Sequence, residues 1–84
     1  MKKYNNKSNL AGLLIKSHRE KLNYTKVDVS TKLQLLGINI SREELYRIEK
    51  GIKILKDFEL VALCIVLQID FSTLKNELSN NTSN

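Results

Sequence analysis

Residues 25–51 read TKVDVSTKLQLLGINISREELYRIEKG, and this stretch decides the fold of the chain. It contains two hydroxyl residues that are each followed three places later by a carboxylate, Thr25 by Asp28 and Ser41 by Glu44. This is the spacing of a capping box, in which each side chain accepts a hydrogen bond from the backbone N–H of the other residue. The stretch therefore predicts one helix after Thr25 and another after Ser41.

Two glycines indicate where these helices end. Gly37 lies in the short apolar connection between them, and Gly51 follows the second helix. Glycine favours these positions because the residue after a helix often adopts a positive φ. Two short capped helices joined by a glycine-containing turn are typical of a helix-turn-helix, whose second helix usually enters the DNA major groove.

Length and composition predict a small all-α domain. The chain has 84 residues, 42% of them hydrophobic, with three glycines and no proline to interrupt helices. A chain of this size forms one domain with one small core. Five helices are predicted, over residues 10–22, from 26 to a stop at Gly37, 42–50, 58–68 and 71–78. They are flanked by a flexible basic arm at 1–9 and a disordered polar tail at 79–84.

The positive charge is concentrated at the N-terminus. Residues 1–26 carry seven basic side chains and one acidic one, a net +6, whereas residues 27–84 carry seven basic and eight acidic ones, a net −1. Such an excess favours binding to the phosphate backbone of a nucleic acid. Many small soluble domains are also basic, so the charge alone leaves both interpretations open.

Several classes of protein are disfavoured by what the sequence lacks. The single cysteine, Cys64, excludes an internal disulfide and predicts a cytoplasmic protein. No apolar run follows the basic start, as a signal peptide would require, and none is long enough to span a membrane. The single histidine, His18, has no neighbours at metal-ligand spacing, so no metal site is predicted. With one histidine, one cysteine, no glycine loop to hold a phosphate and carboxylates mainly at capping positions, no cofactor, small-molecule ligand or enzymatic activity is predicted.

Hydrophobic spacing assigns the buried face of each predicted helix. The inward positions are Ala11, Ile15, His18 and Leu22 in the first helix, Val29, Leu33 and Leu36 in the second, and Leu45 and Ile48 in the third. The fourth, FELVALCIVLQ, is apolar on nearly all sides, so we expect it to be buried on several sides with Cys64 inside. Asp57 and Asp70 are the expected caps of the last two helices.

The sequence resembles the Cro/C1-type, or lambda-repressor-like, helix-turn-helix regulators of the XRE family. The resemblance covers roughly residues 10–75 and is strongest over SREELYRIEKG, residues 41–51, which look like the recognition helix and its Glu-x-Gly ending. AGLLIKSHR (11–19) is similar to the first helix of the family, 25–33 to the second, and DFEL onward (57–67) to the fourth. The resemblance implies a compact five-helix DNA-binding domain with the helix-turn-helix at its second and third helices.

The family pattern also implies roles for individual residues. Arg19 and Glu49 correspond to a structural ion pair. The base-reading positions are Arg42, Glu43, Tyr46 and Arg47, and phosphate contacts are expected from Lys26, Ser41, Lys50 and Lys53. The implied partner is double-stranded DNA, bound by a homodimer of a bacterial or phage repressor. Phe71, Leu74 and Leu78 are candidates for the dimer contact or, alternatively, for closing the core over the fourth helix.

Three departures from the family pattern bear on the function. Lys26 replaces the usual glutamine, which still permits a phosphate contact, and the connection from Ser30 to Ser41 is about five residues longer than in the compact motif. Glu43 and Glu44 place negative charge at the end of the helix that approaches DNA. Glu44 completes a capping box, but Glu43 either accepts from a cytosine amino group, is a tolerated charge at the rim, or signals weakened DNA binding. The alternative function is a protein-interaction module of the same fold, such as an antirepressor or an antitoxin-like partner.

Overall fold

The computed structural model describes residues 11–82, and it describes side chains as far as Asn76. The chain forms five helices: α1 (Gly12–Lys21), α2 (Lys26–Leu35), α3 (Arg42–Lys50), α4 (Asp57–Leu67) and α5 (Phe71–Thr82). No strand occurs in residues 11–82, and the segment 52–56, which could also have formed one, is irregular. The predicted all-α fold is confirmed, although α5 continues past its predicted end at Leu78. The basic arm at 1–9 lies outside the described residues.

Both predicted capping boxes are present and set the starts of α2 and α3. The Thr25 hydroxyl accepts from the backbone N–H of Asp28 at 3.0 Å, and the Asp28 carboxylate accepts from the Thr25 N–H at 2.8 Å. Ser41 and Glu44 repeat this exchange at 3.1 and 3.0 Å. Each box provides partners for N–H groups that a helix start leaves without an acceptor inside the helix.

The first four helices end in the same way, with a residue of positive φ just beyond the helix. These residues are Asn23, Gly37, Gly51 and Gln68, with φ of 60°, 80°, 77° and 57°. At the end of α2, the Ile38 N–H donates to the Leu33 carbonyl at 3.0 Å and the Gly37 N–H donates to the Gln34 carbonyl at 2.9 Å. This is the Schellman motif, which turns the chain sharply out of the helix.

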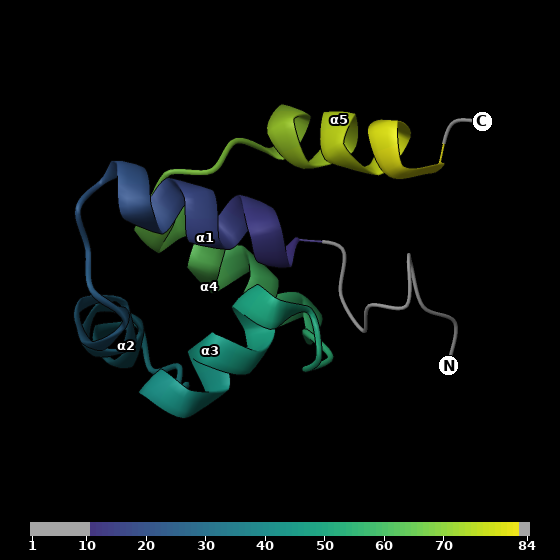
Figure 1. Ribbon diagram of the computed structural model, residues 1–84. Coiled ribbons are helices and arrows are strands. Elements are labelled where there is room, and N and C mark those ends of the chain that lie inside the picture. The colour runs from purple at the N-terminus through teal and green to yellow at the C-terminus, as the bar shows by residue number, and fades with distance from the viewer. Residues whose placement is uncertain (1–10, 83–84) are drawn as a thin grey trace.

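The hydrophobic core lies among the first four helices. Figure 1 shows α1 crossing α4, with α3 below them and α2 at one side, and α1 and α2 each contact both α3 and α4. The predicted inward residues Ile15, Val29, Leu33, Leu45 and Ile48 are fully buried. They pack with the other buried apolar side chains, which are Ala11, Ile40, Ala62, Leu63, Leu67 and Ile69.

The predicted burial of α4 and of Leu36 was wrong. α4 is not enclosed, because it buries Ala62, Leu63 and Leu67 on one face and leaves Phe58, Val61 and Ile65 more than half exposed. Leu36, predicted to face inward, is 47% exposed because α2 ends at Leu35, before the helical spacing reaches it. The error in α4 arises because an apolar pattern without polar residues does not indicate which face of a helix is covered, whereas the error at Leu36 arises from where α2 ends.

The start of α4 also differs from the prediction. Lys56 is the cap residue and Asp57 is the first helical residue. The Glu59 carboxylate accepts from the Lys56 backbone N–H at 3.0 Å, as the third residue of a capping box does. Cys64, expected to be buried, is only partly so, and burial raises the pKa of its thiol.

Candidate nucleic-acid interface

The outer face of α3 presents the residues predicted to read DNA bases. Arg42, Glu43, Tyr46 and Arg47 are all exposed, whereas the opposite face of the helix is buried in the core. The period of the helix produces this division because Leu45 and Ile48 must point inward. The face therefore carries two guanidinium groups, one phenol and one carboxylate, all able to form hydrogen bonds with groups outside the protein.

Tyr46 is the residue around which α2 and α3 bring their positive charges together. The ammonium nitrogen of Lys26, the first residue of α2, lies 6.0 Å from the centre of the Tyr46 ring. That of Lys50, at the end of α3, lies 5.5 Å from the same ring. Contacts of cations with an aromatic face are attractive at such distances. Two of the predicted phosphate-binding lysines thus flank a predicted base-reading side chain.

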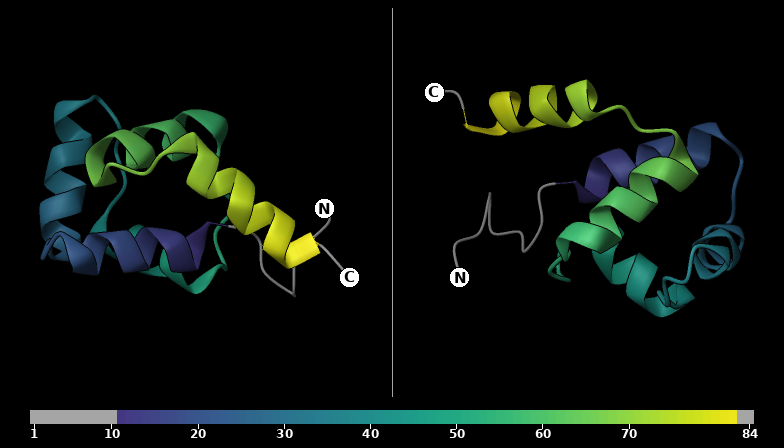
Figure 2. Two further views of the ribbon diagram at one scale, coloured as in Figure 1. Left: turned by 90° about the horizontal axis from the view of Figure 1, so that it is seen from above. Right: turned by 180° about the vertical axis from the view of Figure 1, so that it is seen from behind.

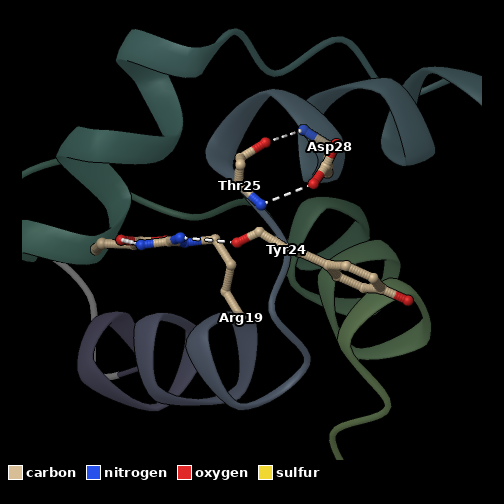
Figure 3. A network of polar contacts seen from close by, with 5 residues as sticks. Arg19, Tyr24, Thr25 and Asp28 are labelled. Atoms are coloured by element: carbon tan, nitrogen blue, oxygen red, sulfur yellow. Dashed lines mark hydrogen bonds and ion pairs between the residues drawn. The ribbon is translucent and has the colours of Figure 1, made fainter.

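Arg19 and Glu49 hold α3 in place from within. Arg19 Nε donates to Glu49 Oε2 at 2.6 Å and Nη2 donates to Oε1 at 3.2 Å, so the pair is bidentate and buried. Arg19 Nη1 also donates to the Tyr24 carbonyl at 2.9 Å, beside the Thr25–Asp28 capping box (Figure 3). The hydrogen bond to Glu49 raises the pKa of Arg19. One guanidinium group thereby joins α1, α3 and the turn that leads into α2.

A hollow lies beside the start of α2 and opens to the surface. Its volume is about 450 Å³, and its lining includes Lys26 and Arg42 together with the turn residues Asn23, Tyr24 and Thr25. Arg42 Nη1 also lies 3.8 Å from the Glu43 carboxylate, with both side chains well exposed. The helix start contributes a positive dipole end to the same region, which favours an anion.

Lys53 has a different environment from the other predicted phosphate contacts. Its ammonium nitrogen lies 3.4 Å from Glu59 Oε1 and 3.4 Å from the Ile54 carbonyl oxygen, and the side chain is mostly covered. Lys53 therefore forms an ion pair with the start of α4. A contact between Lys53 and DNA would have to compete with this pair.

The acidic groups of the two capping boxes are held in their charged form. Hydrogen bonds from the backbone of Ser41 lower the pKa of Glu44, and hydrogen bonds from the backbone of Thr25 lower that of Asp28. The capping box thus explains why a negative charge, that of Glu44, is present at the start of α3. Ser41, a predicted phosphate contact, is exposed, and its hydroxyl accepts from the Glu44 N–H while keeping its own hydrogen to donate.

Phe71 and Leu74, two of the three dimer candidates, differ in burial. Phe71 is 77% exposed, whereas Leu74 packs partly against the core. Leu78 belongs to α5, but its side chain lies outside the described residues. Leu74 therefore helps to close the core, and the dimer contact stays a prediction.

Neither a metal centre nor a membrane helix is found in residues 11–82. His, Cys, Asp and Glu side chains do not gather in groups of three or more there. None of the described helices combines the length and apolar character needed to cross a bilayer.

Comparison with known proteins bears directly on this arrangement of helices. A family model described as helix-turn-helix matches residues 15–74, which include α1 to α4 almost entirely and the start of α5. The chain belongs to the Cro/C1-type helix-turn-helix family. This is a family of DNA-binding regulatory domains, not of enzymes. No curated protein and no solved structure gives a match.

Some features of this helix-turn-helix domain were missed by sequence reasoning. The ion pair of Lys53 with Glu59 and the hydrogen bond from Ser30 Oγ to the Ile40 carbonyl at 2.5 Å were not predicted. The first had no local signal, because Lys53 and Glu59 are six residues apart and Lys53 lies in an irregular segment. The second had no signal either, since it depends on how the long connection folds back over α2.

Proposed function

We propose that this helix-turn-helix protein is a sequence-specific DNA-binding transcriptional repressor whose α3 enters the major groove of double-stranded DNA. The observation that carries the proposal is the outer face of α3, where exposed Arg42, Tyr46 and Arg47 have the lysines 26 and 50 beside them. Side chains that form hydrogen bonds read base edges, and flanking cations bind phosphates and fix the register.

Within this interface Arg47 is the proposed principal base-reading residue. It lies one turn inside α3 on the exposed face, and an arginine can donate two hydrogen bonds to a guanine edge. Arg42, at the first turn, contacts a base or a phosphate, and Tyr46 contacts bases between them. Glu43 accepts from a cytosine amino group, with Arg42 close enough to offset part of its charge.

The proposed phosphate contacts come from Lys26, Lys50 and Ser41, with Lys53 as a further one. Lys26 and Lys50 approach one ring from two helices, so a phosphate strand passing Tyr46 would meet both. Lys53 contributes only if its ion pair with Glu59 opens. A homodimer would place two copies of α3 on half-sites about one helical turn apart, on a pseudo-palindromic operator.

A second candidate function is a protein-interaction module with weakened DNA binding. Glu43 is the observation that favours it, since Glu44 is engaged in capping and Glu43 accepts no such hydrogen bond at the start of α3. In that case the outer face of α3 would bind another protein, and the chain would act as an antirepressor or an antitoxin-like partner.

Selection of a randomised duplex pool, followed by fluorescence anisotropy on the enriched sequence, tests these functions. We expect a repeated half-site to be enriched. Arg47→Ala should remove about 1–3 kcal/mol of discrimination at one base pair. Lys16→Ala on α1 is the control that removes an equal charge from an exposed site off the interface. Weak binding that salt abolishes, with no enriched sequence, would refute the repressor and favour the protein-interaction module.

A further inference from the structure

The aromatic ring of Tyr46 lies where α2 and α3 meet on the surface proposed to bind DNA. α3 lies on the side of the molecule away from α5, with α2 packed beside it (Figure 2). Tyr46 is 49% exposed, so one part of the side chain is packed and the rest faces solvent. Lys50 follows it by one turn of α3, whereas Lys26 comes from the start of α2. The ring is thus placed between cations of two different helices.

The ring attracts these cations without neutralising them. The ammonium nitrogens of Lys26 and Lys50 lie 6.0 and 5.5 Å from its centre. An aromatic face is negative but the ring has no net charge, so a cation held there keeps its full charge. Lys53 shows the contrast, because the Glu59 carboxylate offsets its charge from 3.4 Å. No carboxylate within residues 11–76 forms an ion pair with Lys26, so its charge stays available to a phosphate.

Restraint of a lysine before binding favours the bound state. A lysine side chain has many rotamers, and fixing it against a phosphate lowers its entropy. A side chain that is already restrained in the free protein loses less entropy on binding. We propose that Tyr46 is a positioning residue for the DNA backbone, whose ring holds Lys26 and Lys50 together so that both meet phosphates at once. The inference rests on the proposed function and adds this role to the base contact of Tyr46.

A positioning role differs from base reading in what it makes DNA binding depend on. Bases differ from one duplex to another, but every duplex presents the same phosphates. A residue that only reads bases therefore changes the affinity for one sequence. A residue that positions phosphate-binding lysines changes the affinity for every sequence. Binding to a duplex without an operator separates the two roles.

Fluorescence anisotropy with a duplex of unrelated sequence tests the role of the ring. Tyr46→Leu should weaken binding about five- to tenfold, because both lysines then lose their restraint. The salt slope should stay unchanged, since no charge is removed. Tyr46→Phe keeps the ring and should bind this duplex within about twofold of the wild type. Tyr46 is half exposed, so folding should persist in both variants and is checked by circular dichroism.

A double-mutant cycle shows whether Tyr46 acts through Lys26. Lys26→Gln should cost about threefold less affinity in the Tyr46→Leu background than in the wild type, because Lys26 is already less effective there. Lys16→Gln is the control. It removes the same charge from an exposed site on α1, so its effect should be equal in both backgrounds.

Nuclear magnetic resonance of the protein tests the contact itself, with and without DNA. The Tyr46 ring current should shift the methylene protons beside the ammonium groups of Lys26 and Lys50, in Tyr46→Phe as in the wild type but not in Tyr46→Leu. The shift should persist on the duplex. Its absence, or equal losses of affinity for Tyr46→Leu and Tyr46→Phe, would overturn the positioning role. A loss confined to the selected operator would overturn it too, while leaving the proposed function intact. A wild type that binds no duplex would refute both.

Discussion

Arg19 is the residue at which three parts of the fold meet. It is 8% exposed and its partner Glu49 is 6% exposed, so two opposite charges lie almost wholly inside the protein. Removing ions from water costs several kcal/mol each, and only close pairing offsets that cost. Arg19 reaches this balance by donating to both carboxylate oxygens of Glu49 and to the Tyr24 carbonyl. The pair therefore makes the position of α3 sensitive to a single substitution.

Loss of one partner should be far more costly than loss of both. Glu49→Ala is expected to lower the free energy of unfolding by about 3–5 kcal/mol, because Arg19 keeps its charge without its main partner. Arg19→Met combined with Glu49→Leu should cost much less. Urea denaturation followed by circular dichroism measures both changes. The exposed pair Arg42 and Glu43 is the control, where Glu43→Ala should change stability by less than about 1 kcal/mol. Equal costs for Glu49→Ala and Glu43→Ala would contradict this account.

Single residues differ in how far the sequence predicts their surroundings. Helical period predicted Leu45 and Ile48 to point inward, which leaves the outer face of α3 to Arg42, Glu43, Tyr46 and Arg47, where the structure has them. The pairing of Arg19 with Glu49 came only from the family resemblance, since the two residues are 30 positions apart. The approach of Lys26 to Tyr46 also joins two helices, and no local pattern encodes such a distance.

At the scale of helices, the sequence predicts some helix starts and ends better than others. The capping boxes and the two glycines correctly predicted both ends of α3, the start of α2 and its stop at Gly37. Asn23 and Gln68 end α1 and α4 with the same positive φ, but Gln68 gives no warning because glutamine rarely adopts it. α4 has apolar residues on every side, so its sequence predicts burial without indicating which face stays uncovered.

Acid should weaken α2 and α3 through their capping boxes. The pKa values of Asp28 and Glu44 are lowered in the folded protein, so the unfolded chain binds protons first as the pH falls. The stabilisation is complete above the unfolded values near 4 and is lost as the pH falls through the lower folded values. Thermal unfolding between pH 7 and 2 should therefore show Tm falling below about pH 4.5.

Glu44→Gln isolates the contribution of one box. Its Tm should lie below that of the wild type at neutral pH, and the difference should shrink on acidification, when the wild-type carboxylate is also neutral. Glu43→Gln is the matched control. It removes the same charge from the same turn of α3, but Glu43 does not cap the helix. A Glu44→Gln difference that stays constant down to pH 2 would show that its charge does not stabilise α3.

The whole molecule separates two kinds of surface. The cations Lys26 and Lys50 gather with Tyr46 where α2 starts and α3 passes. An open groove formed by the connection after α2 and by Phe58, Val61 and Ile65 of α4 is instead apolar, with Asp57 as the charged residue of its lining. The sequence predicted the first surface from the pattern of charge and the resemblance. It could not predict the second, because the groove exists only where the long connection after α2 meets α4.

Salt dependence of DNA affinity distinguishes the lysines of the first surface. Each phosphate contact that is lost should reduce the slope of log K against log salt concentration by about 0.9. Lys26→Gln is expected to produce that change, whereas Lys16→Gln, which removes the same charge from an exposed site on α1, should leave the slope unaltered. Lys53→Gln should change the slope less than Lys26→Gln, since Lys53 is already paired with Glu59. Anisotropy titrations of the selected duplex from 50 to 200 mM salt measure all three slopes. Equal slopes for Lys16→Gln and Lys26→Gln would mean that the start of α2 attracts DNA only through net charge, without contacting a phosphate.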